Sequence, residues 1–326
     1  DVNKNPIIDT SLFEENRLYR PMAGKVYKMY PVETIRGCPY TCKFCNSPDQ
    51  MKLYKDLGHN YFRKKRMDLV YKELKHFKEI HKIEYNYFWA DTFLGISKKE
   101  FEEFCEMYKD IKLPFWCQTR PETINEHRVK TLKKMGVARI AFGIEHGNEK
   151  FRAKYLDRKM SNEIITEGIK TVLREEVPVS VNNMIGFPYE TRELAFDTIR
   201  LNKTFGAPEI VDNNSYPFTP FTGTPLRKLC EELGYVKETD IVNSVMSQGS
   251  LLNMPQFSGE EVDGLTKTFN MYVKFPEDRW DEIRIAEKNT KEGNKKFNEL
   301  KEEFVETFWK DGIPLPDFHD LHASFN

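Results

Sequence analysis

Short apolar or aromatic runs alternate with longer amphipathic runs from about residue 32 to residue 217. This alternation predicts strands connected by helices around a parallel sheet. The expected strands cover residues 33–37, 84–90, 114–118, 137–143, 178–185 and 209–217. Because such crossovers are right-handed, six units should curl into an open barrel with its ligands at the carboxyl ends of the strands. The predicted fold class is therefore α/β, a partial (β/α)6 TIM-like barrel with a helical C-terminal extension.

The segments between the expected strands carry apolar residues near the helical period of about 3.6 residues. Gly136 directly follows one of these segments and is expected to end that helix. The clearest apolar stripes are Val70, Leu74, Phe77 and Ile80; Val129, Leu132 and Met135; and Ile165, Ile169, Val172 and Leu173.

The pattern divides the chain into three segments. Residues 1–30 contain Pro, Asn and Arg with little periodicity, which predicts a linker-like N-terminal segment. Residues 31–225 carry the alternation and form the expected core. Residues 226–326 have helical stripes, and their Lys- and Glu-rich run from about 282 to 307 is interpreted as a solvated helix face. Because the chain opens on Asp1, a processed or excised piece of a longer protein is expected.

Charge is nearly balanced, with 50 Lys and Arg against 51 Asp and Glu in 326 residues. A chain with almost no net charge has no overall electrostatic attraction to nucleic acid or to an anionic membrane surface, so neither is favoured as a partner. No apolar stretch approaches the roughly 18 residues of a membrane span, and the first residues do not form a secretory leader. The expected location is cytoplasmic.

Three of the six cysteines, Cys38, Cys42 and Cys45, lie within eight residues of the chain. Disulfide frameworks do not crowd cysteines in this way, so metal binding or redox chemistry is favoured. The three thiolates follow the first expected strand and so belong at the active end of the barrel. Three ligands leave one iron of a [4Fe–4S] cluster open, because a closed cluster has four cysteines. Cys105 and Cys117 are interpreted as small buried hydrophobic residues.

Zinc is the alternative metal for this group of cysteines. A structural zinc site needs a fourth Cys or His at compact spacing, and the nearest histidine, His59, lies fourteen residues beyond Cys45. The spacing of three and then two residues, with Phe44 before the third cysteine, resembles the radical S-adenosylmethionine (SAM) superfamily. The resemblance implies that the open iron chelates SAM. It also implies that an electron, from a donor such as flavodoxin or ferredoxin, cleaves SAM to methionine and a 5′-deoxyadenosyl radical. The protein orients these cofactors and excludes water and oxygen.

The resemblance places SAM contacts at the ends of the second and third expected strands. Asp91 stands where the superfamily commonly has a Gly-Gly-Glu stretch for the methionine amino group. Either its carboxylate or nearby backbone carbonyls take that role, or Asp91 is a helix N-cap. Gln118 and Arg120 would face the barrel mouth and bind the SAM ribose or carboxylate, or the substrate. An outward salt bridge is the alternative for Arg120.

The segment from Phe142 to Asn148 resembles the Gly-Ile-Glu-Ser-Gly segment of many radical SAM enzymes. The resemblance implies that Glu145 hydrogen-bonds the ribose or the amino group of SAM. Arg158 would hold the SAM carboxylate with two bonds, or else face solvent. His146 is interpreted as structural rather than as a general acid.

Ile185 and Gly186 end the fifth expected strand, in a segment similar to the one that lines adenine in this superfamily. Gly186 would let the backbone approach the base, and Ile185 would pack on its face. Residues 216–225 form a Pro- and Gly-containing turn that is expected over the barrel mouth, near adenine or substrate. No catalytic residue is assigned beyond these cofactor contacts.

Residues 145–152, 185–188 and 220–225 together most resemble the branch whose members usually carry an N-terminal cobalamin-binding domain and are often methyltransferases. The chain lacks the Asp-x-His-x-x-Gly motif of that domain. Either an upstream domain binds cobalamin, or the protein works without it.

Three functional hypotheses follow from these patterns. They are a cobalamin-linked methyltransferase, a cobalamin-free radical enzyme (rearrangement, cyclisation or methylthiolation), and a zinc-bound interaction module. A tRNA methylthiotransferase is less favoured, because residues 255–310 look helical and charge-balanced rather than basic. The substrate, whether a small molecule, a lipid or a peptide, is not identified by the sequence.

Overall fold

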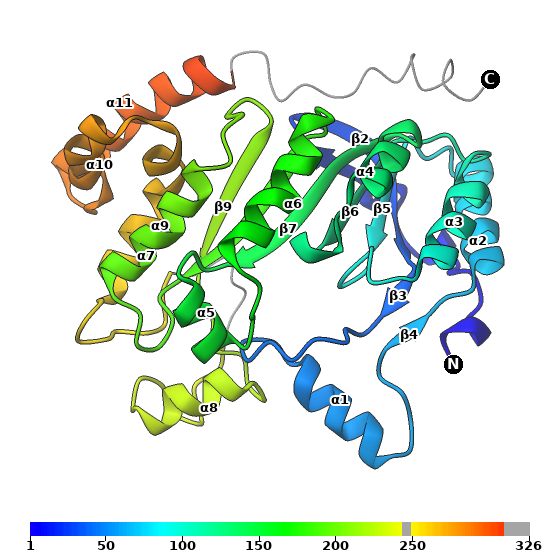
Figure 1. Ribbon diagram of the computed structural model, residues 1–326, viewed down its shortest axis with the longest axis horizontal. Helices are drawn as coiled ribbons and strands as arrows, with labels where there is room; N and C mark the ends of the chain where they lie inside the picture. The colour runs from blue at the N-terminus through cyan, green and yellow to red at the C-terminus, as the bar shows by residue number, and fades with distance from the viewer. Residues whose placement is uncertain (243–248, 310–326) are drawn as a thin grey trace.

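Six parallel strands form a curled, open half-barrel in the part of the chain that the computed structural model describes, residues 1–242 and 249–309 (Figure 1). They follow one another in the order β2-β5-β6-β7-β8-β9, and β1 pairs antiparallel with β2 at the edge. A small separate sheet pairs β3 with β4. The strands are β1 (Tyr19–Met22), β2 (Lys25–Glu33), β3 (Ile35–Arg36), β4 (Arg63–Lys64), β5 (Tyr85–Trp89), β6 (Phe115–Thr119), β7 (Val137–Glu145), β8 (Val179–Ile185) and β9 (Val211–Pro217). The predicted α/β partial barrel is confirmed.

Helices connect the parallel strands, as the apolar stripes predict. Several begin at a side chain that accepts a backbone N–H of the first turn, as Ser97, Asn125 and Ser161 do. The helices are α1 (Ser47–Asp56), α2 (Met67–Ile80), α3 (Lys98–Tyr108), α4 (Glu126–Lys134), α5 (Glu149–Leu156), α6 (Asn162–Arg174), α7 (Arg192–Lys203), α8 (Pro225–Glu232), α9 (Gly259–Lys274), α10 (Trp280–Glu287) and α11 (Lys291–Phe308). Gly136, with a φ of +91°, follows the end of α4 as expected.

Apolar side chains of strands and helices pack into one continuous core around β2 to β8. Helix α2 contributes Val70, Leu74 and Phe77, all fully buried, whereas Ile80 of the expected stripe is 64% exposed. Cys117 is also fully buried in this core, and the half-buried Cys105 packs against the edge of the core. Both agree with their interpretation as small hydrophobic residues. Burying each such aliphatic or aromatic side chain contributes about 1.5–3 kcal/mol, so this core holds the strand ends in fixed positions.

The first barrel strand lies earlier than predicted, and part of the segment interpreted as linker-like, residues 1–30, has regular structure. Residues 1–18 include short 3-10 helices, and β1 and β2 form a hairpin that joins the main sheet. Pro31 conceals the strand in the sequence, because proline cannot donate to a central ladder. It is tolerated because β1 pairs only with Lys25 to Lys28 of β2, which leaves Pro31 on an open edge. Residues 35–36, inside the strand expected at 33–37, form the short β3.

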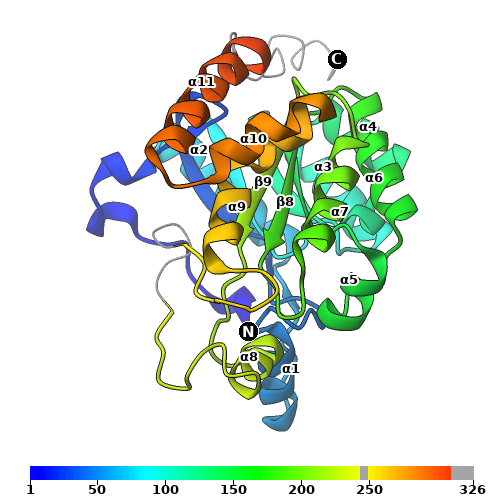
Figure 2. The same ribbon diagram turned by 90° about the vertical axis from the view of Figure 1, so that its left-hand side faces the viewer.

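The C-terminal segment is helical as expected, but it packs closely on the barrel. Helix α9 packs against β9 and α7, and it buries Val262, Leu265 and Phe269 in a second core (Figure 2). The Lys- and Glu-rich run from about 282 to 307 forms two helices, α10 and α11, because the chain turns at 288–290. The part of this expected extension at 243–248 and 310–326 lies outside the described residues. No helix within the described ranges combines the length and apolar character that crossing a membrane requires.

Candidate active site

The loop between β3 and α1 brings Cys38, Cys42 and Cys45 to one cavity of about 220 Å³. Other walls come from the carboxyl ends of β5, β6 and β7, as expected for an α/β barrel. The cavity is lined by Cys38, Tyr40, Cys42, Phe44, Cys45, Ser47, Asp91, Gln118, Thr119, Arg120, Gly143, Glu145, Arg158 and Asn182. The structure therefore brings together the three predicted metal ligands and five of the seven predicted cofactor contacts.

The cysteine loop is fixed from outside the barrel by the end of α5. The backbone N–H of Lys43 donates to Leu156 O at 3.2 Å, and the Thr41 hydroxyl donates to Asp157 at 2.6 Å. The backbone N–H of Leu226, in α8, donates to Lys43 O at 3.1 Å. Contacts far apart in sequence thus set the position of the three thiols.

Two buried guanidinium groups lie against one of the three sulfurs. The Nη1 atoms of Arg120 and Arg158 lie 3.5 Å and 3.6 Å from Cys42 Sγ. Burial opposes the charge on Arg158, but Glu145 and Cys42 more than offset this, so the pKa of Arg158 lies above its usual range. Both arginines are buried, Arg120 at 9% and Arg158 at 4% exposed, so neither faces solvent. Arg120 nevertheless forms a salt bridge with Glu122, a carboxylate outside the cavity lining, at 2.5 Å.

Glu145 ends β7 in the left-handed region, with a φ of +67°, next to an irregularity in the pairing with β8. Its carboxylate folds back over Gly143, where an added Cβ would collide with it. Arg158 Nη1 lies 3.8 Å from Glu145 Oε1. Burial raises the pKa of Glu145, while Arg158 and Arg120 lower it by a smaller amount. The strained backbone thus holds a carboxylate inside the cavity.

The opposite wall carries Asp91, just beyond β5, and Cys38. Partial burial raises the pKa of Asp91, and the charge of Glu33 adds to this. Burial also raises the pKa of the Cys38 thiol to about 11, against a hydrogen bond from the backbone of Tyr40. Gln118, on β6, also lines the cavity. Carboxylate, amide and guanidinium groups therefore surround the thiols.

Ile185 and Gly186 do not line this cavity with the other predicted contacts. Ile185 is fully buried in the second core. At Gly186, whose φ is +91°, an added Cβ would meet Val262 Cγ1 at 2.9 Å. Close packing of α9 thus accounts for the glycine. The contact of these two residues with adenine stays a prediction.

His146 is a buried structural residue, as interpreted from the sequence. Its ring stacks on Phe151 with centroids 4.3 Å apart, and its Nδ1 accepts the backbone N–H of Asn148 at 3.0 Å. Its Nε2 lies 3.0 Å from Oε1 of Glu190, whose Oε2 accepts two backbone N–H groups of the turn after β8. This pair joins the turns after β7 and β8 and does not reach the cavity.

Sequence reasoning missed several lining residues, above all Tyr40 and Asn182. Tyr40 lies between the first two cysteines, and Arg120 stacks on its ring at 3.7 Å. Asn182 accepts from Asn214 Nδ2 at 3.1 Å and lies opposite Gly143 in the sheet. The alternating pattern of β8 could have shown that Asn182 faces inward. No sequence signal pairs Tyr40 with Arg120.

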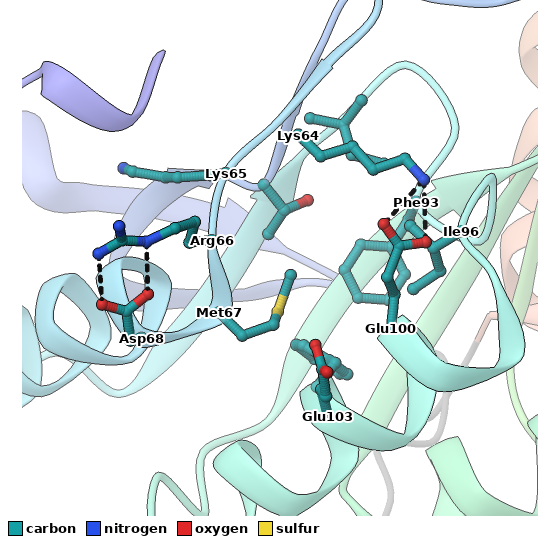
Figure 3. Close-up of a pocket in the computed structure, with 12 residues that line it drawn as sticks. Lys64, Lys65, Arg66, Met67, Asp68, Phe93, Ile96, Glu100 and Glu103 are labelled. Carbon is teal, nitrogen blue, oxygen red and sulfur yellow. Dashed lines mark hydrogen bonds and ion pairs between the residues drawn. The ribbon is translucent and has the colours of Figure 1, made fainter. Parts of the chain in front are cut away.

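A larger cavity of about 580 Å³ lies between the β3–β4 sheet and the starts of α2 and α3 (Figure 3). Its charged groups have ion-pair partners: Lys64 Nζ lies 2.9 Å from Glu100, and Arg66 lies 2.8 Å from Asp68. Lys65 and Glu103 pair with Glu73 and Lys99, outside the cavity lining. Its floor is apolar, with Met67 among the lining residues. Neither thiols nor unpaired charges point to chemistry there.

The donor set of the smaller cavity fits an iron–sulfur cluster. Soft thiolates are the ligands such clusters require, and three from one loop leave an iron open. Among residues 1–242 and 249–309, no three Cys, His, Asp or Glu side chains converge tightly enough for a single metal ion.

Comparison with known proteins agrees with this geometry. The family model of the radical SAM superfamily matches residues 32–201, just over half of the 326. An uncharacterized methyltransferase of Pyrococcus horikoshii is 27% identical over 253 residues, covering 75% of this chain and 50% of that protein. An anaerobic magnesium-protoporphyrin IX monomethyl ester cyclase of Cereibacter sphaeroides is 24% identical over 267 residues, covering 79% of this chain and 40% of its own length. The chain thus spans half or less of both relatives.

A solved structure shares the fold. The radical SAM methyltransferase TsrM from Kitasatospora setae, with cobalamin and a [4Fe–4S] cluster bound, has a TM-score of 0.54 at 13% identity and covers 85% of this chain and 61% of its own. This likeness shows the fold, a curled parallel half-barrel, and the thiols of this chain lie at its carboxyl edge. The chain belongs to the radical SAM superfamily. As a radical SAM enzyme, it uses a [4Fe–4S] cluster and SAM.

Proposed function

We propose that this chain is the radical-generating core of a cobalamin-linked methyltransferase whose substrate is unidentified. The observation that carries the proposal is the shared cavity of Cys38, Cys42 and Cys45 with the polar side chains of three strand ends. When bound, the cluster and SAM supply reductive cleavage of the sulfonium bond, which gives methionine and a 5′-deoxyadenosyl radical. The chain itself supplies binding, orientation and exclusion of water.

The residues of the cavity divide the binding of SAM among them. Cys38, Cys42 and Cys45 would hold the cluster with three thiolates, which is one fewer than a closed cluster takes. Glu145 is held over Gly143 and accepts hydrogen bonds from the ribose or the amino group. Asp91 and Gln118 bind the methionine and ribose groups from the other side, and Ile185 and Gly186 approach the adenine. The assignments of Glu145, Asp91 and Gln118 rest on their placement in the cavity and on the family resemblance. Those of Ile185 and Gly186 rest on the resemblance alone.

Cobalamin and methyl transfer are supported by the comparisons rather than by a residue of this chain. A relative with 27% identity is named a methyltransferase, and TsrM, which binds cobalamin, has the same fold. Cobalamin would then come from an additional domain, since the chain spans half or less of those two curated relatives. The sequence encoded upstream of Asp1 tests this directly.

A ring-forming radical enzyme is the second candidate. It is supported by the 24% identity to the magnesium-protoporphyrin IX monomethyl ester cyclase over 79% of this chain. An electron donor such as flavodoxin or ferredoxin serves either candidate, because SAM cleavage consumes an electron. The zinc-bound interaction module is not supported by the cavity.

The test is anaerobic reconstitution with iron and sulfide, followed by reaction with SAM carrying a labelled methyl group. Reductant is supplied with and without hydroxocobalamin. We expect about four iron and four sulfide per chain and formation of 5′-deoxyadenosine, as the superfamily implies. Label transferred to cobalamin supports the methyltransferase. If 5′-deoxyadenosine forms at the same rate with and without cobalamin and no label reaches cobalamin, the cyclase-like candidate is supported. A protein that takes up no iron and sulfide overturns both candidates.

A further inference from the structure

The three cysteine sulfurs have unequal surroundings. Cys42 is 7% exposed and accepts from both Arg120, at 3.5 Å, and Arg158, at 3.6 Å. Cys45 instead accepts the backbone N–H of Ser47 at 3.4 Å. Among the contacts of the described residues, the guanidinium groups of Arg120 and Arg158 reach this loop from elsewhere in the chain, and the sulfur they contact is that of Cys42.

We infer that Arg120 and Arg158 form a cationic clamp on Cys42 that raises the reduction potential of the bound cluster. The inference rests on the proposed function, since it needs a cluster on the three cysteines. Reduction adds an electron to a cluster that already carries thiolate charge. Hydrogen bonds and positive charge at a ligand sulfur stabilise the more negative state. The effect is large where water is excluded, because the effective dielectric constant is low.

Arg120 is held rigidly in place for this task. Its guanidinium lies 3.7 Å from the centroid of the Tyr40 ring, within the cysteine loop itself. Its Nε donates to Glu122 Oε1 at 2.5 Å, and Glu122 is outside the cavity lining. The ring and the carboxylate fix the plane of the guanidinium, so that Nη1 faces Cys42. Glu122 also neutralises part of the charge that Arg120 presents to the sulfur.

Arg158 is the second guanidinium group in contact with the same sulfur. Its Nη2 donates to the carbonyl of Gly143, and its backbone N–H donates to Arg152 O at 3.1 Å. Arg158 is 4% exposed, and Glu145 at 3.8 Å is the carboxylate beside it. If Arg158 served only to hold the SAM carboxylate, it would affect SAM affinity and leave the potential of the SAM-free cluster unchanged. The two roles are therefore separable.

The experiment measures the midpoint potential of the SAM-free cluster by anaerobic redox titration with electron paramagnetic resonance detection. The variants are Arg120→Gln, Arg158→Gln and Glu122→Gln, each matched to wild type in iron and sulfide content. We expect each arginine variant to shift the reduction equilibrium at least about tenfold toward the oxidised state, a potential lower by about 59 mV for one electron. Glu122→Gln removes a negative charge and should raise the potential. This opposite sign is not expected of a merely structural role.

Arg139→Gln is the matched control, because Arg139 is also a buried, ion-paired arginine of the barrel, 2.9 Å from Asp212. Its potential should equal that of wild type. If a Gln variant does not reconstitute, Arg120→Lys and Arg158→Lys keep the charge and should give smaller shifts in the same direction. Wild-type potentials in both arginine variants would overturn the clamp while leaving the proposed function intact. A wild-type protein that takes up no cluster would overturn the proposed function itself.

Discussion

The thiol cavity and the larger cavity of Figure 3 lie near the same rim of the sheet, yet only the smaller one is arranged for chemistry. In the larger cavity, Lys64 and Arg66 each have a carboxylate partner of their own. In the thiol cavity, Arg120 and Arg158 converge on one sulfur, and a carboxylate is held there by a strained backbone. Charges satisfied within a pocket stabilise the fold. Charges directed at a group that must bind something else indicate a functional site.

The largest effect is expected for the cysteines of the thiol cavity. Replacing Cys38, Cys42 or Cys45 with Ala should abolish the bound iron and sulfide and all 5′-deoxyadenosine formation, because each removes a ligand of the cluster. Iron and sulfide analysis and product chromatography measure this. Cys105→Ala is the control, since Cys105 packs half-buried on α3. If a variant of Cys38, Cys42 or Cys45 keeps both the cluster and product formation, the replaced cysteine is not a ligand of the cluster.

A smaller effect is expected for the carboxylate. Glu145→Ala should weaken SAM binding about 10- to 100-fold, the usual range for a lost hydrogen bond to a charged group, and leave the cluster content unchanged. Equilibrium binding of SAM to the reconstituted protein measures it. Glu163→Ala, an exposed carboxylate on α6, is the matched control. Equal SAM affinity in wild type and Glu145→Ala would remove Glu145 from the site.

The pH dependence of SAM binding should follow the raised pKa of Glu145. Because burial raises this pKa, the carboxylate takes up a proton at a higher pH than an exposed glutamate would. SAM affinity should therefore be constant well above the raised pKa and fall as the pH drops through it. In Glu145→Gln this fall should be smaller, leaving the contribution of Asp91, whose pKa is also raised. Identical pH profiles for the two proteins would contradict the assignment.

The smallest effect is expected in the larger cavity. Lys64→Ala removes an ion pair whose side chains are about one-third exposed, at 33% and 31%, and such pairs contribute at most about 1 kcal/mol. Thermal or denaturant unfolding should show a loss of this size or less, and SAM affinity should equal that of wild type. A clear loss of SAM affinity in this variant would show that both cavities belong to one site.

The sequence by itself determined the fold class, the three thiols and most of the strand ends. Five of the six expected strands match β5 to β9, because alternation of apolar and polar residues follows from burial within each segment. Spacing identified the cysteine loop, since its three cysteines lie within eight residues of the chain. Strand ends then indicated Asp91, Gln118, Arg120 and Glu145, because parallel strands end at one edge.

Only the tertiary structure decided which of these groups meet. It placed two arginines against the sulfur of Cys42, Arg158 from 116 residues away in the chain and Arg120 from 78. It also packed Val262 so close to Gly186 that a Cβ there would collide with it. It also showed that Lys25–Glu33 is the first strand, where Pro31 hides the pattern. Local sequence records burial and backbone preference. Contacts between distant segments depend on how helices such as α5 and α9 pack on the sheet, and no single segment encodes that packing.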